Sequence, residues 1–278
     1  KFMIKFEDVE TDLFQIESGV PQGSVLGPVL YTIFTSDIPN SQHTLLATFA
    51  DDTAILATDF DARTASMILQ NSINDIEHWF RKWRIQVNEM KSSHISFTLR
   101  KEGAPPVLLN NIPLAEVQSV KYLGMHLDKR LTWKQHLWTK RLQLNLKRNK
   151  LMWLLGNKSK LSLENKLLLY KVMLKPIWTY GIQLWGSAST SNIEIIQRFQ
   201  SLTLRRIIEA PWYVSNACIH RDLQIPSVKE EITKYSKKYQ SKLENHNNNL
   251  AINLLDNSRT TERLKRANII DLTSRFVN

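Results

Sequence analysis

The stretch TLLATFADDTAILAT, residues Thr44–Thr58, places two short apolar runs, Leu45–Phe49 and Ala54–Ala57, on either side of the adjacent Asp51 and Asp52. Apolar, β-branched and aromatic residues around a tight polar centre predict a β-hairpin with largely buried strands. Two neighbouring carboxylates are costly to bury unless a cation compensates them. Oxygen ligands without a nearby Cys or His favour Mg²⁺ or Mn²⁺ over zinc. Because Asp is also a common turn residue, this stretch alone is equally compatible with an exposed turn.

Upstream lies SGVPQGSVLGPVLY, residues 18–31, where Pro21 and the glycines predict a rigid loop. Gly23 has no side chain, so a bulky ligand can approach the backbone there. Gln22, between Pro21 and Gly23, can present an amide to a base or a sugar. The apolar run Val25–Phe34 then predicts a buried helix.

In this order and spacing, GVPQGSVLGPVLY and FADD resemble the template–primer loop and the metal-binding hairpin of the reverse transcriptase palm. The resemblance implies that Asp51 is a metal ligand and that Asp52 is the less stringent member of the pair. It also implies that Pro21, Gln22 and Gly23 contact the template and the incoming nucleotide. The implied chemistry is two-metal nucleotidyl transfer with Mg²⁺ or Mn²⁺, in which one ion lowers the pKa of the primer 3′-hydroxyl and the other holds the triphosphate.

Length and composition limit the alternatives. A chain of 278 residues can form one large domain or two modest ones. The formal net charge of +11 favours a polyanionic partner. No apolar run is long enough to span a bilayer and no signal peptide opens the sequence, so no membrane partner is expected. The single Cys218 excludes an intrachain disulfide and fits a reducing intracellular compartment. Lys1 precedes an apparent strand without an initiator Met, which predicts a fragment of a longer polypeptide.

Three further motifs follow the hairpin. Asp61 is the expected N-cap of a long amphipathic helix, which packs as core. Its apolar stripe is Leu69, Ile73, Ile76, Phe80, Trp83 and Val87. The motif NEMKSSHISFT at Asn88–Thr98 resembles the family motif whose lysine, here Lys91, gives a proton to departing pyrophosphate. A solvated surface lysine remains equally compatible. Asn110-Asn111 predicts a hairpin turn.

YLG resembles the primer grip, the hairpin that holds the 3′ end of the growing strand; its residues are Tyr122, Leu123 and Gly124. From Trp133 helical periodicity dominates. Trp133–Trp153 predicts a helix with one basic face that grips phosphates as a thumb does, or a solvated face without a partner. The proposed grip residues are Lys134, Lys140, Arg141, Lys147 and Arg148, with Trp138, Leu142 and Leu146 on another side.

The C-terminal half predicts more helices. One runs from Ser162 towards Leu174 and is kinked or ended by Pro176. Capping boxes at Ser191–Glu194 and Ser227–Glu230 predict two further helix starts. The expected fold class is α+β: a right-hand polymerase palm, an antiparallel sheet with packed helices, followed by an all-α thumb and a C-terminal helical region. The expected domains are a partial palm (1–130), a helical thumb (131–190) and a C-terminal helical region with a partly disordered tail (191–278).

The segments YLGMHLDKRLTWKQHL, LLYKVMLKPIWTYGIQLWGS and APWYVSNACIHRDLQIP resemble insect non-LTR retrotransposons of the jockey type. This resemblance implies an RNA-directed DNA polymerase acting in target-primed retrotransposition. The implied partners are a template RNA and a DNA primer, held as an RNA–DNA duplex, and deoxynucleoside triphosphates. The implied location is the nucleus and cytoplasm, as a ribonucleoprotein.

One expected feature is missing from the sequence. The family places another metal-binding aspartate tens of residues before the glycine loop, whereas the acidic residues found there lie too close to it: Glu7, Asp8, Glu10, Asp12 and Glu17. The nucleotide-binding fingers would also lie upstream. We therefore expect residues 1–278 to be inactive alone. The alternative is a decayed or co-opted non-catalytic nucleic-acid-binding module. A viral RNA polymerase is a weaker alternative, because Ala50 stands where those enzymes usually carry Gly.

Overall fold

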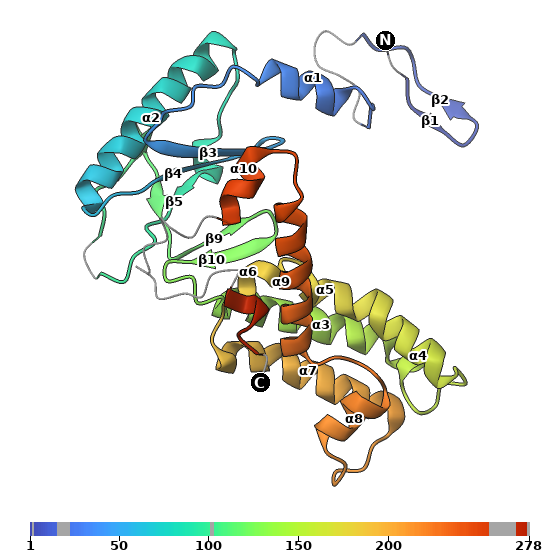
Figure 1. The fold of residues 1–278 in the computed structure, drawn as a ribbon. Coiled ribbons are helices and arrows are strands. Elements are labelled where there is room, and N and C mark those ends of the chain that lie inside the picture. The colour runs from blue at the N-terminus through green and yellow to red at the C-terminus, as the bar shows by residue number, and fades with distance from the viewer. Residues whose placement is uncertain (2, 16–22, 101–102, 256–270, 277–278) are drawn as a thin grey trace. The chain divides into compact units, whose positions relative to one another are not determined.

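The computed structural model describes residues 1, 3–15, 23–100, 103–255 and 271–276 (Figure 1). The backbone divides into two compact units, unit 1 (residues 1–94 and 103–115) and unit 2 (residues 95–102 and 116–278). The α+β class is confirmed, with about half of the chain helical. In the described part, however, the strands form only two-stranded ladders and no larger sheet. No helix described there is long and apolar enough to cross a membrane.

Unit 1 begins with a short hairpin and is built mainly around one long helix. Its elements are β1 (Lys5–Phe6), β2 (Val9–Glu10), α1 (Gly27–Phe34), β3 (Thr44–Phe49), β4 (Asp52–Ala57), α2 (Ala62–Lys82), a 3₁₀ turn (Glu89–Lys91), β5 (Ser93–His94), β6 (Leu108–Leu109) and β7 (Ile112–Pro113). The strand β8 (Ala115–Glu116) lies at the boundary with unit 2. The predicted hairpin turn at Asn110-Asn111 is confirmed, because both residues have positive φ and join β6 to β7.

The β3–β4 hairpin is confirmed, but the prediction that its strands are largely buried is wrong. Leu46 pairs with Ile55, and Ile55 packs on the small core of unit 1. The opposite face carries Leu45, Phe49 and Leu56, whose exposed fractions are 65%, 63% and 43%. Side chains alternate across a strand, and of the two faces of this hairpin only the one bearing Ile55 meets the helix α2 and the core in the described part of unit 1.

Helix α2 matches its prediction. Asp61 is the N-cap, and its carboxylate accepts a 3.0 Å hydrogen bond from the backbone N–H of Thr64. Ile73 and Ile76 are buried as expected, together with Trp79, which the stripe did not include. The helix ends at Lys82. The last residue of the stripe, Val87, therefore packs on the core from the loop that follows.

Helix α1 forms as predicted, but its expected burial is wrong, because Gly27 is its one buried residue. Its C-terminal end is joined to α2 by polar contacts rather than by a core. The two indole N–H groups of Trp79 and Trp83 donate to the carboxylate of Asp37, at 3.0 and 3.2 Å. The ring of Phe34 packs edge-on against Trp83. The apolar residues of α1 are therefore available to a partner surface rather than committed to the core of unit 1.

Unit 2 is a helical bundle with one hairpin. Its elements are β9 (Ser119–Tyr122), β10 (Met125–Asp128), α3 (Lys134–Leu155), α4 (Leu163–Leu169), a π-helical turn (Tyr170–Leu174), α5 (Lys175–Thr179), α6 (Ile182–Trp185), α7 (Thr190–Ile208), α8 (Asn216–Asp222), α9 (Val228–Glu244), α10 (Asn249–Ile252) and the 3₁₀ turns Asn253–Leu255 and Asp271–Thr273. Fully buried apolar residues from α3 to α9 form its large core. The short helix expected around Leu264–Leu272 falls mostly outside the described residues.

Asp128 determines how the β9–β10 hairpin continues into α3. Its carboxylate accepts hydrogen bonds from the backbone N–H groups of Thr132 and Trp133, both at 2.9 Å, and from the Thr132 hydroxyl at 3.1 Å. Trp133, the N-cap of α3, adopts the left-handed conformation with φ 62°. The Asp128 carboxylate therefore accepts hydrogen bonds from N–H groups that have no partner within the helix, and it sets the direction in which the helix begins.

The predicted helix from Ser162 is confirmed, and Pro176 has the expected effect. Ser162 caps α4, whose path passes through the π-helical turn before α5 begins at Lys175. Proline cannot supply a backbone N–H, so the regular hydrogen-bond ladder is interrupted one turn before it. The capping box at Ser191 is wrong, because Ser189 is the N-cap of α7 and Ser191 lies inside the helix. The capping box at Ser227 is confirmed by both of its hydrogen bonds.

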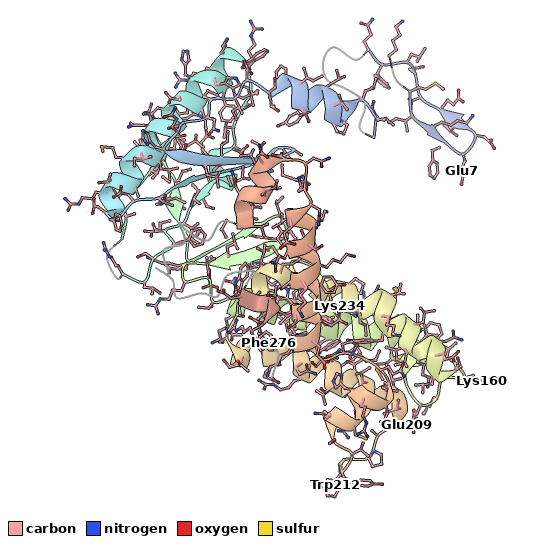
Figure 2. The ribbon with its side chains drawn as sticks, viewed as in Figure 1. Glu7, Lys160, Glu209, Trp212, Lys234 and Phe276 are labelled. Carbon is pink, nitrogen blue, oxygen red and sulfur yellow. The ribbon has the colours of Figure 1, made fainter. Side chains whose placement is uncertain are left out.

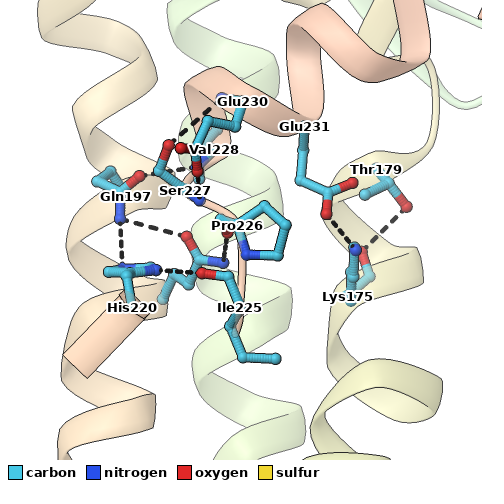
Figure 3. A network of polar contacts seen from close by, with 11 residues as sticks. Lys175, Thr179, Gln197, His220, Ile225, Pro226, Ser227, Val228, Glu230 and Glu231 are labelled. Atoms are coloured by element: carbon cyan, nitrogen blue, oxygen red, sulfur yellow. Dashed lines mark hydrogen bonds and ion pairs between the residues drawn. The ribbon is translucent and has the colours of Figure 1, made fainter. Parts of the chain in front are cut away.

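A polar network joins α7, α8 and α9 inside this bundle (Figure 3). The amide oxygen of Gln197 accepts a hydrogen bond from the Val228 N–H at 2.8 Å, and its amide nitrogen lies 3.1 Å from His220 Nε2. His220 Nδ1 lies 2.8 Å from the carbonyl oxygen of Ile225. Nearby, the ammonium group of Lys175 pairs with the buried carboxylate of Glu231. The network fixes the C-terminal helices against α7.

Candidate functional site

The tip of the β3–β4 hairpin presents both predicted metal ligands to solvent. Asp52 is the first residue of β4 and pairs with Phe49, while Ala50 and Asp51 form the two-residue turn. Ala50 has φ 51°, a left-handed conformation that costs a non-glycine residue about 1 kcal/mol. This tight turn is what places the two carboxylates side by side at one end of the ladder.

The donor chemistry at this tip fits a hard divalent cation, but the donor set is incomplete. Asp51 and Asp52 offer carboxylate oxygens, which Mg²⁺ prefers. The part of the chain that the structure describes contains no group of three or more His, Cys, Asp or Glu residues able to hold a metal ion. Further ligands must come from a substrate, from water or from protein outside these residues.

The glycine loop is described only at its end. Pro21 and Gln22 lie outside the described residues. Gly23 has φ 86°, and a Cβ placed on it would meet no atom within 4 Å. The position therefore combines a conformation that favours glycine with open space over the backbone, as expected for a surface that a ligand approaches.

Lys91 ends a 3₁₀ turn in unit 1 and is exposed. The side chain of Asn88 caps this turn by accepting a 3.1 Å hydrogen bond from the Lys91 backbone N–H. This contact accounts for Asn88 in the motif, whereas any residue except proline could supply the N–H at position 91. The Lys91 ammonium group has no carboxylate within ion-pair distance among the residues described, so it is free to serve a ligand.

The predicted primer-grip motif forms a tight turn in unit 2. Leu123 and Gly124 have φ values of 45° and 75° and join β9 to β10. The turn is held from the helical side of the unit, because the Tyr180 hydroxyl donates a 2.6 Å hydrogen bond to the Leu123 carbonyl oxygen. A Cβ on Gly124 would lie 3.4 Å from the Tyr180 ring. The Lys140 ammonium lies 5.3 Å from the centre of that ring.

Four basic side chains, two lysines and two histidines, lie beside this turn. Lys121 and His126 face each other across the β9–β10 ladder, and His136 and Lys140 approach from α3. The His126 backbone N–H donates to His136 Nδ1 at 3.3 Å. Burial, with the charges of Lys140 and His126, lowers the pKa of His136 to about 4. Burial and the Lys121 charge lower the pKa of Lys140 as well.

We call Lys121, His126, His136 and Lys140 the hairpin base cluster. Sequence analysis missed three of its members and also missed Tyr180. The sequence did contain a signal for Lys121 and His126, since a two-residue turn at Leu123–Gly124 places them opposite each other. The contribution of Tyr180, 57 residues from Leu123, depends on how the helices pack. With a pKa of about 4, His136 is neutral at neutral pH, so Lys121 and Lys140 supply the positive charge that favours an anion beside this turn.

The basic residues predicted along α3 do not share one face. Lys134 is exposed and Lys147 is partly so, but Arg148 is 8% exposed and Arg141 donates to the Ile195 carbonyl oxygen at 3.2 Å. Both guanidinium groups lie against the Phe199 ring. The prediction of one exposed basic face is wrong, because α7 packs on the side of α3 that carries the two arginines. Their contact with nucleic acid stays a prediction. The exposed residues of α3 include Trp138, Leu142 and Leu146.

Charge is divided very unequally between the two units. Unit 1 contains 7 Lys and Arg against 13 Asp and Glu, a formal charge of −6, whereas unit 2 contains 30 against 13, a formal charge of +17. The net positive charge of the chain therefore comes entirely from unit 2. An acidic unit suits cation ligation, and a strongly basic unit suits a polyanion.

Comparison with known families identifies the class. Residues 1–127 match the family described as reverse transcriptase (RNA-dependent DNA polymerase). The matched segment includes both the Asp51-Asp52 hairpin and the Leu123–Gly124 turn. This part of the chain belongs to the reverse transcriptase family.

The chain as a whole is similar to polymerases of Drosophila transposons. It is 40% identical to a probable RNA-directed DNA polymerase from transposon X-element of Drosophila melanogaster, over 99% of this chain and 31% of the relative. It is 35% identical to the RNA-directed DNA polymerase from mobile element jockey of Drosophila funebris, over 99% of this chain and 32% of the relative. The chain thus spans about a third of the length of these curated relatives. No solved structure matches it.

Proposed function

We propose that this chain is the palm and thumb portion of a transposon reverse transcriptase, which copies RNA into DNA by nucleotidyl transfer. The observation that carries the proposal is the Asp51-Asp52 pair at an exposed hairpin tip inside the segment that matches the family. The similarity to RNA-directed DNA polymerases along almost the whole chain supports the same function. The proposed setting is target-primed insertion, with a template RNA, a DNA primer and deoxynucleoside triphosphates as partners.

In the proposed mechanism the residues of unit 1 act on the nucleotide. Divalent ions, when bound, supply charge stabilisation at the primer 3′-hydroxyl and at the leaving phosphate. Asp51 and Asp52 provide carboxylate oxygens for this purpose, and the open backbone at Gly23 leaves space for the nucleotide. The exposed Lys91 ammonium is suited to protonate the departing pyrophosphate.

In the same proposal unit 2 holds the nucleic acid. The Leu123–Gly124 turn presents backbone close to the primer end, and the hairpin base cluster neutralises phosphates beside it. Tyr180 fixes the turn by its hydrogen bond to Leu123. Lys134 and Lys147 on α3 remain proposed phosphate contacts, since their ammonium groups make no ion pair among the described residues.

The decisive experiment replaces Asp51 with Asn in the full-length polymerase. We expect loss of Mg²⁺-dependent DNA synthesis on an RNA template, with nucleic-acid affinity and its salt dependence nearly unchanged. Asp52→Asn in the same protein is the matched control and is expected to reduce synthesis less. Synthesis at the wild-type rate by Asp51→Asn would refute the assignment.

The incomplete metal site leads to a second test. Residues 1–278 alone are expected to give no primer extension with Mg²⁺ or Mn²⁺, because two carboxylates do not complete a two-metal site. Binding of a primer–template by the same preparation would show that the protein is folded. Robust incorporation by residues 1–278 would contradict this part of the proposal.

The second candidate function is a non-catalytic nucleic-acid-binding module. The observation that favours it is the +17 charge of unit 2, which supports binding without any metal. The two candidates differ in the Asp51→Asn result. A module without catalysis shows no synthesis in the wild-type full-length protein, and the substitution then changes nothing.

A further inference from the structure

Four arginines of α3 and α7 approach one another where these helices pack together. Arg141 and Arg148 come from α3, and Arg198 and Arg206 come from α7. Besides burial, the charges of Arg206 and Arg141 lower the pKa of Arg148, and the charge of Arg198 lowers the pKa of Arg141. We call these four residues the arginine cluster.

The arginine cluster lacks counter-charge. None of its members lies within ion-pair distance of a carboxylate in the part of the chain that the structure describes. Arg148 is 8% exposed, and its Nε has no hydrogen-bond partner; the buried Asn145 Oδ1, one turn before it on α3, has none either. A buried cation without a carboxylate beside it is unfavourable, so this cluster has the chemistry of a site completed by an anion.

A turn held by several hydrogen bonds follows the C-terminal end of α7. Arg205 donates hydrogen bonds to the carbonyl oxygens of Pro211 and Val214, at 2.7 and 2.6 Å, and to the Asn216 side chain at 2.9 Å. The Val214 N–H also bonds to the Pro211 carbonyl oxygen at 3.1 Å. The acceptors around this guanidinium are neutral, so its positive charge remains available at the base of the turn.

The two central residues of this turn are aromatic and point outward. Trp212, which is labelled in Figure 2, is 90% exposed. Tyr213 is 72% exposed, and the two ring centres lie 6.0 Å apart with their planes at 81°. The hydrogen-bonded backbone fixes the positions of these two residues, which lowers the entropic cost of ordering them on a ligand. The indole faces are open for stacking rather than packed into a core.

The arginine cluster and the turn are close along the chain. Arg206 and Trp212 are six residues apart, which limits their separation to roughly 20 Å, the span of a few nucleotides. Cationic groups that follow a phosphate backbone, together with exposed rings that stack on bases, are the combination that binds single strands. Duplex bases are already stacked on each other and leave no face for an indole.

We propose that unit 2 carries a single-strand binding surface, in which the arginine cluster contacts phosphates and Trp212 stacks on an unpaired base. This surface lies beyond residues 1–127, the segment that matches the reverse transcriptase family. It is separate from the primer-end contacts proposed at Leu123–Gly124. The proposal shares with the proposed function its choice of nucleic acid as partner, and it includes Arg141 and Arg148, which sequence analysis placed among the phosphate contacts of α3.

The test uses residues 1–278 and measures affinity for a 12-nucleotide RNA and for a duplex of the same length, across a range of salt concentrations. Trp212→Ala is expected to weaken single-strand binding about 5- to 100-fold with an unchanged salt slope, because stacking is not ionic. Trp212→Phe keeps a ring and is expected to stay within about threefold of wild type. Duplex affinity is expected to change less than about twofold in both variants.

The proposed phosphate contacts are tested by the salt dependence of single-strand binding. The double variant Arg198→Gln/Arg206→Gln removes exposed charges and is expected to reduce the single-strand salt slope by about 1.4, or 0.7 per contact. The variant Lys158→Gln/Lys160→Gln removes two exposed lysines elsewhere in unit 2 and is the matched control, with an unchanged slope expected. An unfolding temperature equal to that of wild type shows that a variant is folded. We expect this result because all the replaced side chains except Trp212 are charged surface groups.

The proposal is overturned if Trp212→Ala binds the single strand as wild type does, or if it weakens duplex binding equally. The first result would show that Trp212 does not stack on an unpaired base. An equal slope change in the Lys158/Lys160 control would show a general charge effect and would also overturn the phosphate assignment. The outcome is independent of catalysis, so failure here leaves the Asp51→Asn test intact.

Discussion

The hydroxyl of Tyr180 donates a 2.6 Å hydrogen bond to the carbonyl oxygen of Leu123, so a residue after α5 holds the tight turn between β9 and β10. The turn has two positive φ values. A two-stranded ribbon is marginally stable by itself, and this one is held by the Tyr180 contact together with the burial of Met125 in the core of unit 2. The bond thus couples the helical bundle to the segment that we propose as the primer grip.

Tyr180→Phe tests this coupling. Loss of one hydrogen bond is expected to lower the free energy of unfolding by about 1 kcal/mol. Because the turn then loses its anchor, we also expect affinity for a primer–template duplex to fall severalfold. Urea unfolding and a duplex-binding titration measure the two effects. Tyr213→Phe, which alters an exposed hydroxyl elsewhere in unit 2, is the control and should change neither.

The hairpin base cluster predicts a change in salt dependence. The double variant Lys121→Gln/Lys140→Gln is expected to reduce the salt slope of duplex binding by about 1 to 2, since each phosphate contact accounts for roughly 0.9. Binding isotherms at four or more salt concentrations give the slope. Lys158→Gln/Lys160→Gln again serves as the control. An unchanged slope in the Lys121/Lys140 variant would remove the cluster from the nucleic-acid interface.

His136 predicts a pH dependence of stability. Its folded pKa, about 4, lies below the ordinary value of 6.5, so the unfolded chain takes up the proton first. The stabilisation is complete above pH 6.5 and is lost as the pH falls towards 4, by a total of about 3 kcal/mol. His136→Asn keeps a hydrogen-bond acceptor for the His126 N–H but does not titrate, so its stability should vary less over this range. His43→Asn, at an exposed position, should retain the wild-type profile in urea unfolding.

We expect Arg148 to lower the stability of the free protein while it favours the binding of a polyanion. Because a buried cation without a carboxylate is unfavourable, Arg148→Met is expected to raise the free energy of unfolding by about 1 kcal/mol in the free protein. The same variant should gain less thermal stabilisation from added polyanion than wild type does. Thermal scans with and without a single-stranded oligonucleotide measure both. A large loss of stability without nucleic acid would show that Arg148 serves packing alone.

The Lys175–Glu231 pair predicts an asymmetry between its two deletions. Glu231 is 1% exposed, whereas the Lys175 side chain is 22% exposed. Lys175→Met strands a buried carboxylate and is expected to cost about 3 to 5 kcal/mol. Glu231→Gln keeps an acceptor for an ammonium group that can reach water, and about 1 kcal/mol is expected. Chemical unfolding of the two variants compares these values, and equal costs would contradict the assignment.

Local signals predicted the elements that depend on neighbouring residues. The Asp61 cap, the Asn110-Asn111 turn and the Ser227 capping box each rest on a side chain or a dihedral within a few residues, and each is present. One local signal failed, because Ser189 and not Ser191 is the N-cap of α7. The other errors concern burial. The outer face of the β3–β4 hairpin and the helix α1 are exposed. An apolar run shows that a segment can be buried, but it does not show which other segment covers it.

The sequence by itself determined the acidic hairpin, the tight turn after Tyr122 and the basic character of the C-terminal portion, since these follow from residue type and short-range spacing. The tertiary structure alone decided that Tyr180 and the histidines join that turn. It also decided that Arg148 faces α7 without a counter-charge and that Trp212 stands clear of any core. Such relationships depend on which helix faces pack together, and helical periodicity does not specify the neighbour that each face meets.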